Sequence, residues 1–237
     1  MKNILITGGS RGIGAACVKE FSKNGFRVFL NYNNSEKAAK KLADETGAIP
    51  VRADISNSDE VRKMIDFIHG YGKISVLVNN AGIAEQKLFS DISENDWDRM
   101  FDINIKGMFL VTKAVLPDMI HEKSGKIINF SSIWGISGAS CEVHYSASKA
   151  AVIGFTKALA KETGLSGINV NCIAPGVIDT EMNGHLDDET KAELCQETPL
   201  NRMGTPEEVA RLAYFLASSD SDFITGQIIS PNGGFVI

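Results

Sequence analysis

The sequence predicts a single doubly wound α/β domain over residues 1–237, with a seven-stranded parallel sheet and helices on both of its faces. Three observations favour this fold class. Short apolar runs rich in β-branched residues alternate with longer amphipathic segments along nearly the whole chain. No repeat, low-complexity tract or linker rich in proline and glycine interrupts the alternation. A length of 237 residues also suffices for one large core without a metal or a disulfide.

In the first half of the chain, apolar runs predict four strands, and the segments between them have apolar residues at helical spacing. Ser35 and Ser58 stand where two of these helices begin, and we expect them to be N-caps. In chain order the expected elements are strand 3–7, helix 12–24, strand 27–31, helix 35–46, strand 49–53, helix 58–69 and strand 75–79.

The second half of the chain continues the alternation with longer helices. Thr205 is the expected N-cap of the last of them. In chain order the expected elements are helix 94–121, strand 126–131, helix 145–164, strand 169–174, helix 206–217 and strand 227–230.

Right-handed crossovers between these strands produce two βαβαβ halves, the Rossmann arrangement, with a ligand crevice at the carboxyl ends of the strands. The residues at those ends are small, polar or turn-forming, whereas a plain closure of the core would carry more apolar bulk. They are Thr7-Gly8-Gly9, Asn31, Asp54, Asn79-Asn80-Ala81-Gly82, Ser131-Ser132 and Pro175-Gly176. We therefore expect the functional residues along this edge of the sheet.

Charge and composition exclude several classes of function. With 24 basic against 29 acidic residues, the net charge of −5 argues against a nucleic-acid partner, which would require a basic face. No apolar run is long enough for a membrane span, and the first residues lack the pattern of a signal peptide, so we expect a cytoplasmic protein without a membrane partner. The four Cys and four His are scattered, which predicts no metal site and reduced thiols.

A glycine-rich loop joins the first strand to the first helix. Its glycines permit positive φ and a close backbone approach, and the N–H groups at the start of a helix attract a pyrophosphate. The structural alternative is a tight turn without a ligand. The loop predicts a bound nicotinamide dinucleotide, held by Gly8, Ser10, Arg11, Gly12, Ile13 and Gly14.

The end of the second strand indicates which dinucleotide is bound. An NAD site places a carboxylate there for the ribose 2′-hydroxyl, whereas an NADP site lacks that acid and supplies an arginine. Here the strand ends at Asn31 without an acid, and Arg11 projects from the glycine loop. The sequence therefore favours NADPH. Asp54 is expected either to accept a hydrogen bond from the adenine amine or to cap the following helix.

Tyr145 and Lys149 are four residues apart, so they share one face of a helix. A neighbouring ammonium and a helix N-terminus both favour an ionised phenol, which suits Tyr145 to proton transfer. Ser132 follows the fifth strand and is placed to donate to the same carbonyl oxygen. Asn104 is a poor helix former within the long fourth helix, and we expect it to bind water at a local kink.

These motifs together resemble the short-chain dehydrogenase/reductase family over almost the whole chain. The residues that carry the resemblance are Thr7-Gly8-x3-Gly12-Ile13-Gly14, Asn79-Asn80-Ala81-Gly82, Asn104, Ser132, Tyr145-x3-Lys149 and Pro175-Gly176. The resemblance implies that Tyr145 is the proton donor, that Ser132 polarises the carbonyl, and that Asn104 anchors a water molecule. Lys149 would lower the pKa of Tyr145 and hold the nicotinamide ribose. The resemblance also implies a homotetramer and further cofactor contacts from Asn80, Ala81, Gly82, Pro175, Gly176 and Ile178.

Within the family, the chain is similar to the 3-oxoacyl-[acyl-carrier-protein] reductases of fatty acid biosynthesis. Asn169-Val170-Asn171 and Thr225-Gly226-Gln227 follow their pattern. The segment from Trp134 to Tyr145 departs from it and resembles the subgroup described as elongation factor P 5-aminopentanone reductase. The expected substrate is therefore a ketone tethered to acyl carrier protein or, alternatively, to a translation factor. A reductase of free small-molecule ketones is a further alternative.

Acidic residues bear on that choice. The expected substrate lid, at about 176–200, contains seven acids against Lys191, which would repel an acidic carrier protein but not an amine-bearing substrate. A solvated lid face explains the same acids equally well. Glu142 stands three residues before Tyr145 and is expected either to bind a substrate ammonium or to cap the helix that carries Tyr145.

Overall fold

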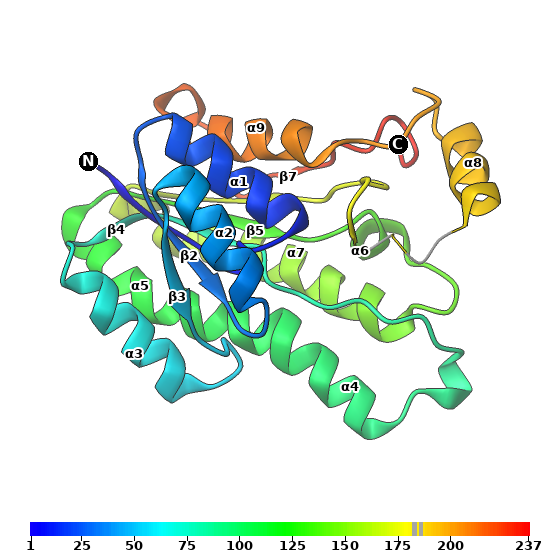
Figure 1. Cartoon of the computed structure of the whole chain (residues 1–237), viewed down its shortest axis with the longest axis horizontal. Helices are drawn as coiled ribbons and strands as arrows, with labels where there is room; N and C mark the ends of the chain where they lie inside the picture. Colours follow the sequence, from blue (N-terminus) through cyan, green and yellow to red (C-terminus); the bar gives the residue numbers. More distant parts are fainter. Residues whose placement is uncertain (182–183, 185–186) are drawn as a thin grey trace.

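A computed structural model describes residues 1–181, 184 and 187–237, and Figure 1 shows a sheet with helices on both faces. All strand pairs are parallel, in the order β3-β2-β1-β4-β5-β6-β7. β1 lies between β2 and β4, so the strand order reverses at β1 and β4, as the predicted fold requires. The strands are β1 Asn3–Ile6, β2 Arg27–Tyr32, β3 Ile49–Arg52, β4 Ile74–Asn79, β5 Gly125–Phe130, β6 Ile168–Ile173 and β7 Ile228–Ile229.

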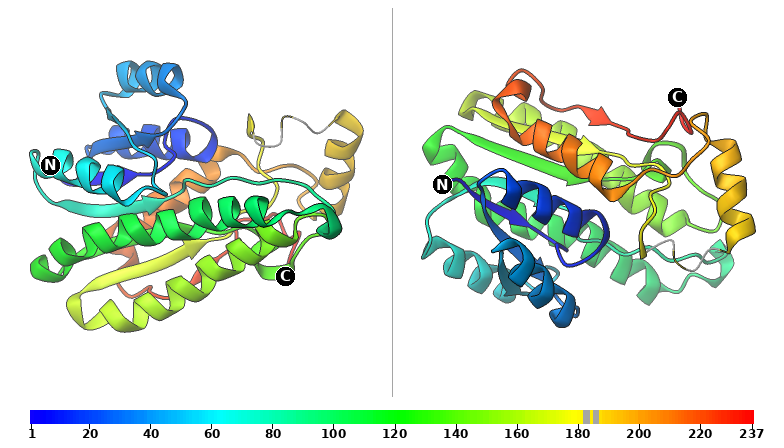
Figure 2. Two further views of the ribbon diagram at one scale, coloured as in Figure 1. Left: turned by 90° about the horizontal axis from the view of Figure 1, so that it is seen from below. Right: turned by 45° about the horizontal axis from the view of Figure 1, so that its top comes forward.

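Every segment predicted to be helical contains a helix, with outer boundaries that differ by at most two residues, whereas α6 and α8 were not predicted. Figure 2 shows the long helices on the lower face, where α4 and α5 run beside α7. The helices are α1 Gly12–Lys23, α2 Glu36–Thr46, α3 Ser58–His69, α4 Glu94–Phe101, α5 Met108–Glu122, α6 Trp134–Ser137, α7 Val143–Thr163, α8 Asp188–Glu197 and α9 Pro206–Ala217.

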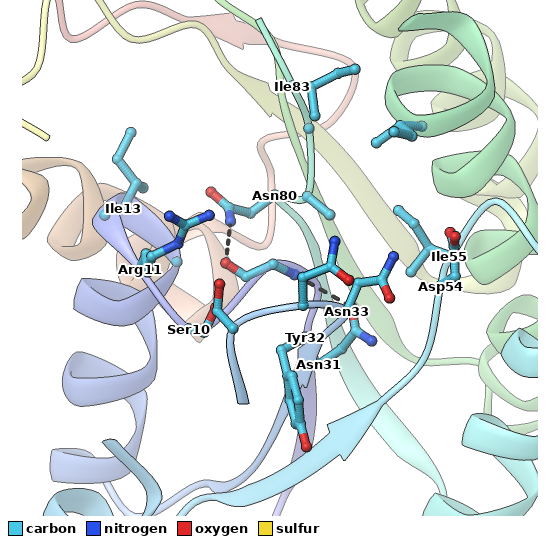
Figure 3. Close-up of a pocket in the computed structure, with 18 of the residues that line it drawn as sticks. Ser10, Arg11, Ile13, Asn31, Tyr32, Asn33, Asp54, Ile55, Asn80 and Ile83 are labelled. Carbon is cyan, nitrogen blue, oxygen red and sulfur yellow. Dashed lines mark hydrogen bonds between the residues drawn. The ribbon is translucent and has the colours of Figure 1, made fainter. Parts of the chain in front are cut away.

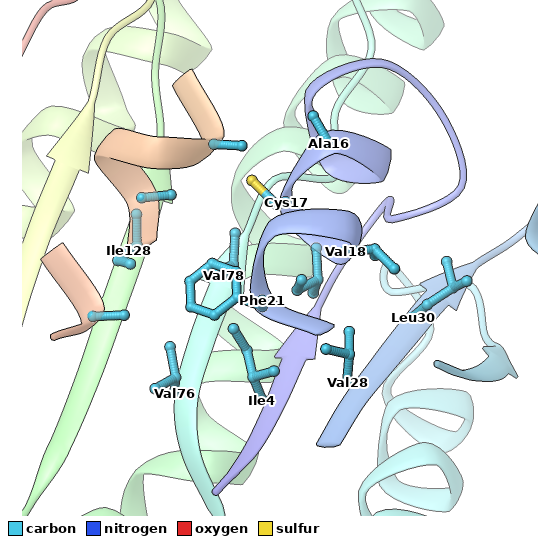
Figure 4. Close-up of a cluster of buried hydrophobic side chains, with 14 of the residues drawn as sticks. Ile4, Ala16, Cys17, Val18, Phe21, Val28, Leu30, Val76, Val78 and Ile128 are labelled. Carbon is cyan, nitrogen blue, oxygen red and sulfur yellow. The ribbon is translucent and has the colours of Figure 1, made fainter. Parts of the chain in front are cut away.

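Two large apolar cores, and a smaller cluster of Met108, Val152 and Cys172, hold the helices against the sheet. Successive residues of β1 point to opposite faces of the sheet. Ile4 and Ile6 pack in one core with Phe21 of α1, whereas Leu5 packs in the other core with Met64 of α3. Figure 4 shows the first core, in which Phe21 lies between the strands and its own helix. Because both faces of β1, β4 and β5 are largely buried, these strands are apolar runs rather than alternating ones.

Three local expectations need correction. The expected helix 94–121 contains a π-helical segment, Asp102–Gly107, that separates α4 from α5. Asn57, not Ser58, caps α3 and accepts from the backbone N–H groups of Asp59 and Glu60, because Ser58 is already the first helical residue. Ser35 stands at the N-cap of α2 but makes no side-chain capping bond.

Thr205 does cap α9, in a capping box with Glu208. The lid contains a helix, α8, that periodicity did not predict, and residues 182–183 and 185–186 of the expected lid lie outside the described residues. In the part of the chain that is described, no helix is both long and apolar enough to cross a bilayer.

Candidate active site

Two adjoining cavities lie at the carboxyl ends of the strands, as expected. The larger, of about 560 Å³, is lined by the glycine loop, by residues 31–35 and by residues 80–84, and is called the cofactor cavity below. The second, of about 490 Å³, is lined by Ser132, Tyr145 and Lys149 and is called the substrate cavity. Ile13, Asn80, Ala84 and Thr180 line both, so the two cavities form one continuous site.

The glycine loop has the backbone shape that a dinucleotide needs. Gly8 and Gly12 have φ of 62° and 51°, which only glycine adopts without strain. A Cβ on Gly14 would collide with the carbonyl oxygen of Gly8 and come within 2.6 Å of Asn80 Nδ2, so this helix packs closely on the loop. The first turn of α1 contains no acid and no side-chain cap bond. Its N–H groups therefore fit a pyrophosphate.

The adenosine end of the cofactor cavity contains no acid at the end of β2. Arg11, Tyr32 and Asn33 lie around this part of the cavity (Figure 3). Asn31 also lines it, but its side chain is buried and holds the loop in place. Its Nδ2 donates to Ala53 O at 3.0 Å, and its Oδ1 accepts from Gly8 N at 3.4 Å. Asn31 is thus a support for the glycine loop rather than a side chain directed at the adenosine.

Asp54 lines the cofactor cavity and does not cap α3. Its Oδ1 accepts from the backbone N of Ser56 at 2.9 Å and from Ser56 Oγ at 2.7 Å, which closes a local turn. The capping alternative for Asp54 is therefore wrong, because Asn57 occupies that position.

Ser132, Tyr145 and Lys149 come together at the substrate cavity, and all three side chains are buried. Ser132 Oγ hydrogen-bonds with the Tyr145 phenol and accepts from Trp134 N at 3.2 Å. Lys149 Nζ lies 5.7 Å from the centroid of the Tyr145 ring and donates to Phe130 O at 3.0 Å. The four-residue spacing on α7 therefore places the ammonium beside the phenol, as predicted.

The pKa of Tyr145 differs from the sequence expectation. Burial raises the pKa of Tyr145 to about 12, while its hydrogen bond with Ser132 opposes that rise and the charge of Glu142 adds to it. Burial also lowers the pKa of Lys149 to about 8. Desolvation outweighs any effect of the Lys149 ammonium on the phenol pKa, and that ammonium is bonded to Phe130 O. The phenol stays protonated near neutral pH, the form that can donate a proton.

Asn104 lies within the π-helical segment, where the helix is locally distorted as predicted. Its side chain is buried, and protein groups occupy both ends of its amide. Oδ1 accepts from Ile83 N at 2.8 Å, and Nδ2 donates to Ile83 O and to Ser148 Oγ, each at 3.0 Å. Asn104 therefore connects the segment after β4 to α7. Its contact on α7 is Ser148, which lies three residues after Tyr145.

A family model described as Enoyl-(Acyl carrier protein) reductase matches residues 8–236. The 3-oxoacyl-[acyl-carrier-protein] reductase FabG of Chlamydia muridarum is 45% identical over 239 residues, covering 98% of this chain and 96% of the relative. The enzyme of the same name from Staphylococcus epidermidis is 39% identical, covering 98% of both. The chain belongs to the short-chain dehydrogenase/reductase family.

The fold agrees with that membership. A crystal structure of 3-oxoacyl-[acyl-carrier protein] reductase from Brucella melitensis superimposes with a TM-score of 0.93 at 34% identity, covering 100% of this chain and 92% of that one. As a member of the short-chain dehydrogenase/reductase family, the chain is an oxidoreductase that acts between a ketone and an alcohol with NADP(H). The glycine loop and the absence of an acid after β2 fit that cofactor.

Glu142 lines the substrate cavity and stands at the N-cap position of α7, but its side chain makes no capping bond. Its Oε1 accepts instead from Gln86 Nε2 at 3.2 Å. The side-chain capping alternative for Glu142 is therefore wrong. The helix begins at Val143, two residues earlier than the sequence predicted.

Sequence reasoning missed several residues of the site in this short-chain dehydrogenase/reductase. Glu85 and Gln86 line the substrate cavity, and α8 contributes Thr190 and Leu194. No motif marked these positions, because they come from an irregular segment and from an unpredicted helix. Of the seven lid acids, Glu181 is the one that lines a cavity among the described residues. The others fit the solvated face that was one of the two alternatives.

Proposed function

We propose that the protein reduces a 3-oxoacyl thioester, carried by acyl carrier protein, to the secondary alcohol with NADPH. The observation that carries this proposal is the gathering of Ser132, Tyr145 and Lys149 at a cavity continuous with the glycine loop. Relatives similar over 98% of the chain and named for this reaction support the choice of substrate.

In the proposed reaction Tyr145 donates a proton from its hydroxyl to the ketone oxygen. Ser132, bonded to the same phenol, holds that oxygen and polarises the carbonyl. Bound NADPH supplies the hydride. Lys149 keeps a positive charge beside the phenol and favours its ionised form after the proton has left. Asn104 positions α7 through Ser148 rather than through a direct contact with the carbonyl.

The cofactor contacts are part of the same proposal. Ser10, Arg11 and Gly12 face the phosphates and the ribose, while Pro175 and Gly176 close the nicotinamide end. The remaining proposed cofactor contacts are Gly8, Ile13, Gly14, Asp54, Asn80, Ala81, Gly82, Tyr145, Lys149 and Ile178, whereas Asn31 contributes by supporting the glycine loop. All of these residues line one of the two cavities, which supports their assignment.

The organisation of the chain completes the proposal. A single sheet with apolar clusters on both faces supports one domain over 1–237. Thr190 and Leu194 of α8 line the substrate cavity, which supports a substrate lid at about 176–200. Trp97 and Phe109 are exposed large apolar side chains on α4 and α5. They support a homotetramer built on these helices. The protein would act in the cytoplasm.

NADPH oxidation tests the proposal with three substrates: an acetoacetyl thioester, its carrier-bound form, and a neutral ketone of similar size. We expect the carrier-bound thioester to have the highest kcat/KM. Equal kcat/KM for the free ketone and the carrier-bound thioester would contradict a carrier-tethered substrate. Loss of all three activities in Tyr145→Phe would tie them to this site.

A second candidate substrate is an amine-bearing ketone attached to a translation factor. The carboxylate of Glu142 in the wall of the substrate cavity favours it, because a partly desolvated carboxylate binds an ammonium more strongly than a neutral group. Glu142→Gln keeps the size of the side chain and removes its charge. We expect that change to raise KM for an amine-bearing ketone while a neutral ketone is unaffected. Equal responses of the two ketones would favour the carrier-bound substrate.

A further inference from the structure

Residues 230–236, called the C-terminal loop below, are held in one shape by hydrogen bonds within the loop. Asn232 Oδ1 accepts from Gly234 N at 2.8 Å, and Asn232 Nδ2 donates to Val236 O at 2.7 Å. Phe235 N donates to Asn232 O at 3.1 Å. The backbone of Phe235 is therefore fixed relative to the rest of the loop.

The C-terminal loop also contacts two segments that surround the substrate cavity. Gly176 lines this cavity, and its N–H donates to Pro231 O at 3.1 Å. A Cβ on Gly176 would come within 2.7 Å of Asn232 Cα, so the two backbones are in close contact. Leu200, three residues after α8, donates from its N to Gly233 O at 3.1 Å. The loop thus lies at the end of the molecule where α6 and α8 are found (Figure 1).

Trp134 lines the substrate cavity and is contacted by this loop. Its ring packs edge-to-face on Phe235, with centroids 5.8 Å apart and planes at 82°. The backbone N of Trp134 donates to Ser132 Oγ at 3.2 Å. A Cβ on Gly135 would come within 2.7 Å of the carbonyl carbon of Lys149, so α6 packs directly on the backbone of α7. Trp134 is therefore held close to the residues that are proposed to bind and protonate the ketone.

The other aromatic residues of the cavity have different roles. Among the described lining residues these are Phe130, which belongs to the first core, and Tyr145, the proposed proton donor. The side chain of Trp134 is half-buried and belongs to neither group. A large ring that packs on Phe235 cannot move away from a ligand without losing this aromatic contact. The indole ring therefore limits the space beside the ketone.

We propose that Trp134 is a specificity-determining residue that restricts the free end of the acyl chain to a few carbons, and that Phe235 is the positioning residue that holds the indole ring. The proposal rests on the reduction of a carrier-bound 3-oxoacyl thioester proposed above, and it narrows that substrate class to short chains. A carrier protein is far larger than a cavity of about 490 Å³ and stays outside it, so the free end of the chain points inward. A short apolar end gains contact with the ring, whereas a longer one overlaps it.

Carrier-bound acetoacetyl and 3-oxooctanoyl thioesters test the role of Trp134. The wild type should have the higher kcat/KM for acetoacetyl. Trp134→Ala should raise the ratio of the 3-oxooctanoyl to the acetoacetyl value about tenfold, the scale on which an apolar pocket discriminates one methylene group. Trp134→Phe, which keeps a smaller ring on Phe235, should give an intermediate ratio. An unchanged ratio in Trp134→Ala would overturn the proposal.

The matched control for these variants is Phe223→Ala. Phe223 is a fully exposed aromatic residue that lines neither cavity. Its removal should leave the ratio of the two kcat/KM values as in the wild type. A ratio that rises equally in Phe223→Ala and Trp134→Ala would show that the change does not arise at the cavity wall, and the proposal would be wrong.

The positioning role of Phe235 requires a coupled measurement. Phe235→Leu should raise the same ratio about threefold, the scale of one edge-to-face aromatic pair, and have no further effect in the Trp134→Ala background. Phe235→Tyr keeps the ring and should retain the wild-type ratio. In a Trp97→Phe background Trp134 is the sole tryptophan, and its fluorescence anisotropy should fall in Phe235→Leu. Unchanged anisotropy, or a full additional effect in the Trp134→Ala background, would show that Phe235 does not act through Trp134.

A binding measurement separates this inference from the proposed reaction. The increase in Tm that 3-hydroxybutyryl and 3-hydroxyoctanoyl thioesters of pantetheine produce in the NADP-loaded protein needs no turnover. In the wild type the shorter thioester should produce the larger increase, and Trp134→Ala should abolish the difference. Equal increases in the wild type overturn the inference even if carrier-bound thioesters are reduced. A difference that depends on Trp134 supports it even if no thioester is reduced, in which case the proposed reaction alone fails.

Discussion

The guanidinium of Arg11 lies 3.4 Å from the carboxylate of Glu181, where the glycine loop meets the lid segment. Both side chains are well exposed, so the pair itself contributes little to stability. Both also line the cofactor cavity. A 2′-phosphate on the adenosine ribose would compete with Glu181 for the same guanidinium, which links cofactor choice to a residue of the lid segment.

Arg11→Ala should weaken NADPH binding by about 1.5 to 3 kcal/mol, the scale of a hydrogen bond to a charged group, and leave NADH binding unchanged. Fluorescence titration of the two nucleotides provides both dissociation constants. Glu181→Gln is the matched variant and should tighten NADPH binding slightly, because it removes the competing carboxylate. Equal losses for NADPH and NADH in Arg11→Ala would show that Arg11 does not contact the 2′-phosphate.

Tyr145→Phe should reduce kcat by at least about 100-fold, because it removes the proton donor while the aromatic ring still packs in the site. Binding of NADPH should remain near normal. Stopped-flow measurement of NADPH oxidation with an acetoacetyl thioester determines the rate, and titration determines the affinity. If the variant retained wild-type turnover, a group other than Tyr145 would have to donate the proton to the ketone.

Lys149→Met should change how stability depends on pH. Burial lowers the pKa of Lys149 to about 8 in the folded state, so the unfolded chain binds more protons between about pH 8 and the usual lysine pKa. Stability of the wild type therefore gains from this group as pH rises through that window. Relative to wild type, the variant should be most stable at pH 7 and lose that advantage progressively as pH rises from about 8 toward the usual lysine pKa of 10.5. Urea unfolding of both proteins at each pH measures the difference, and a constant difference would contradict the low pKa.

Asn57→Ala should destabilise the protein by about 1 kcal/mol, because it removes the cap of α3. Ser58→Ala is the paired control and should cost much less, since Ser58 lies inside the helix. Urea unfolding of the two variants compares them directly. A larger loss of stability for Ser58→Ala than for Asn57→Ala would show that Ser58 caps α3, as the sequence predicted.

The elements, and the gathering of Ser132, Tyr145 and Lys149 at one cavity, could be predicted because their signals are local. Periodicity separates Ile4 and Ile6 from Leu5 onto opposite faces, and the glycines of residues 8–14 determine the loop between β1 and α1. The spacing of Tyr145 and Lys149 on one helix needs no knowledge of distant residues. The two βαβαβ halves were expected from the handedness of parallel crossovers.

The unpredicted features depend on residues far apart in the chain. Burial of Tyr145 by surrounding elements reversed the expected direction of its pKa shift, and helical spacing carries no information about desolvation. Helix α8 has almost no apolar face of its own, so its amphipathic signal is weak, although Thr190 and Leu194 reach the substrate cavity.

The sequence by itself determined the doubly wound sheet, the glycine loop and the residues that gather at the carboxyl ends of the strands, because each follows from local spacing and handedness. Only the tertiary structure decided that Glu85 faces His144 and that Arg11 meets Glu181. Each contact joins two segments that are far apart in the sequence, and no sequence motif includes both of its residues. They form because the packing of helices on the sheet brings those segments to one edge, and packing is a property of the whole core.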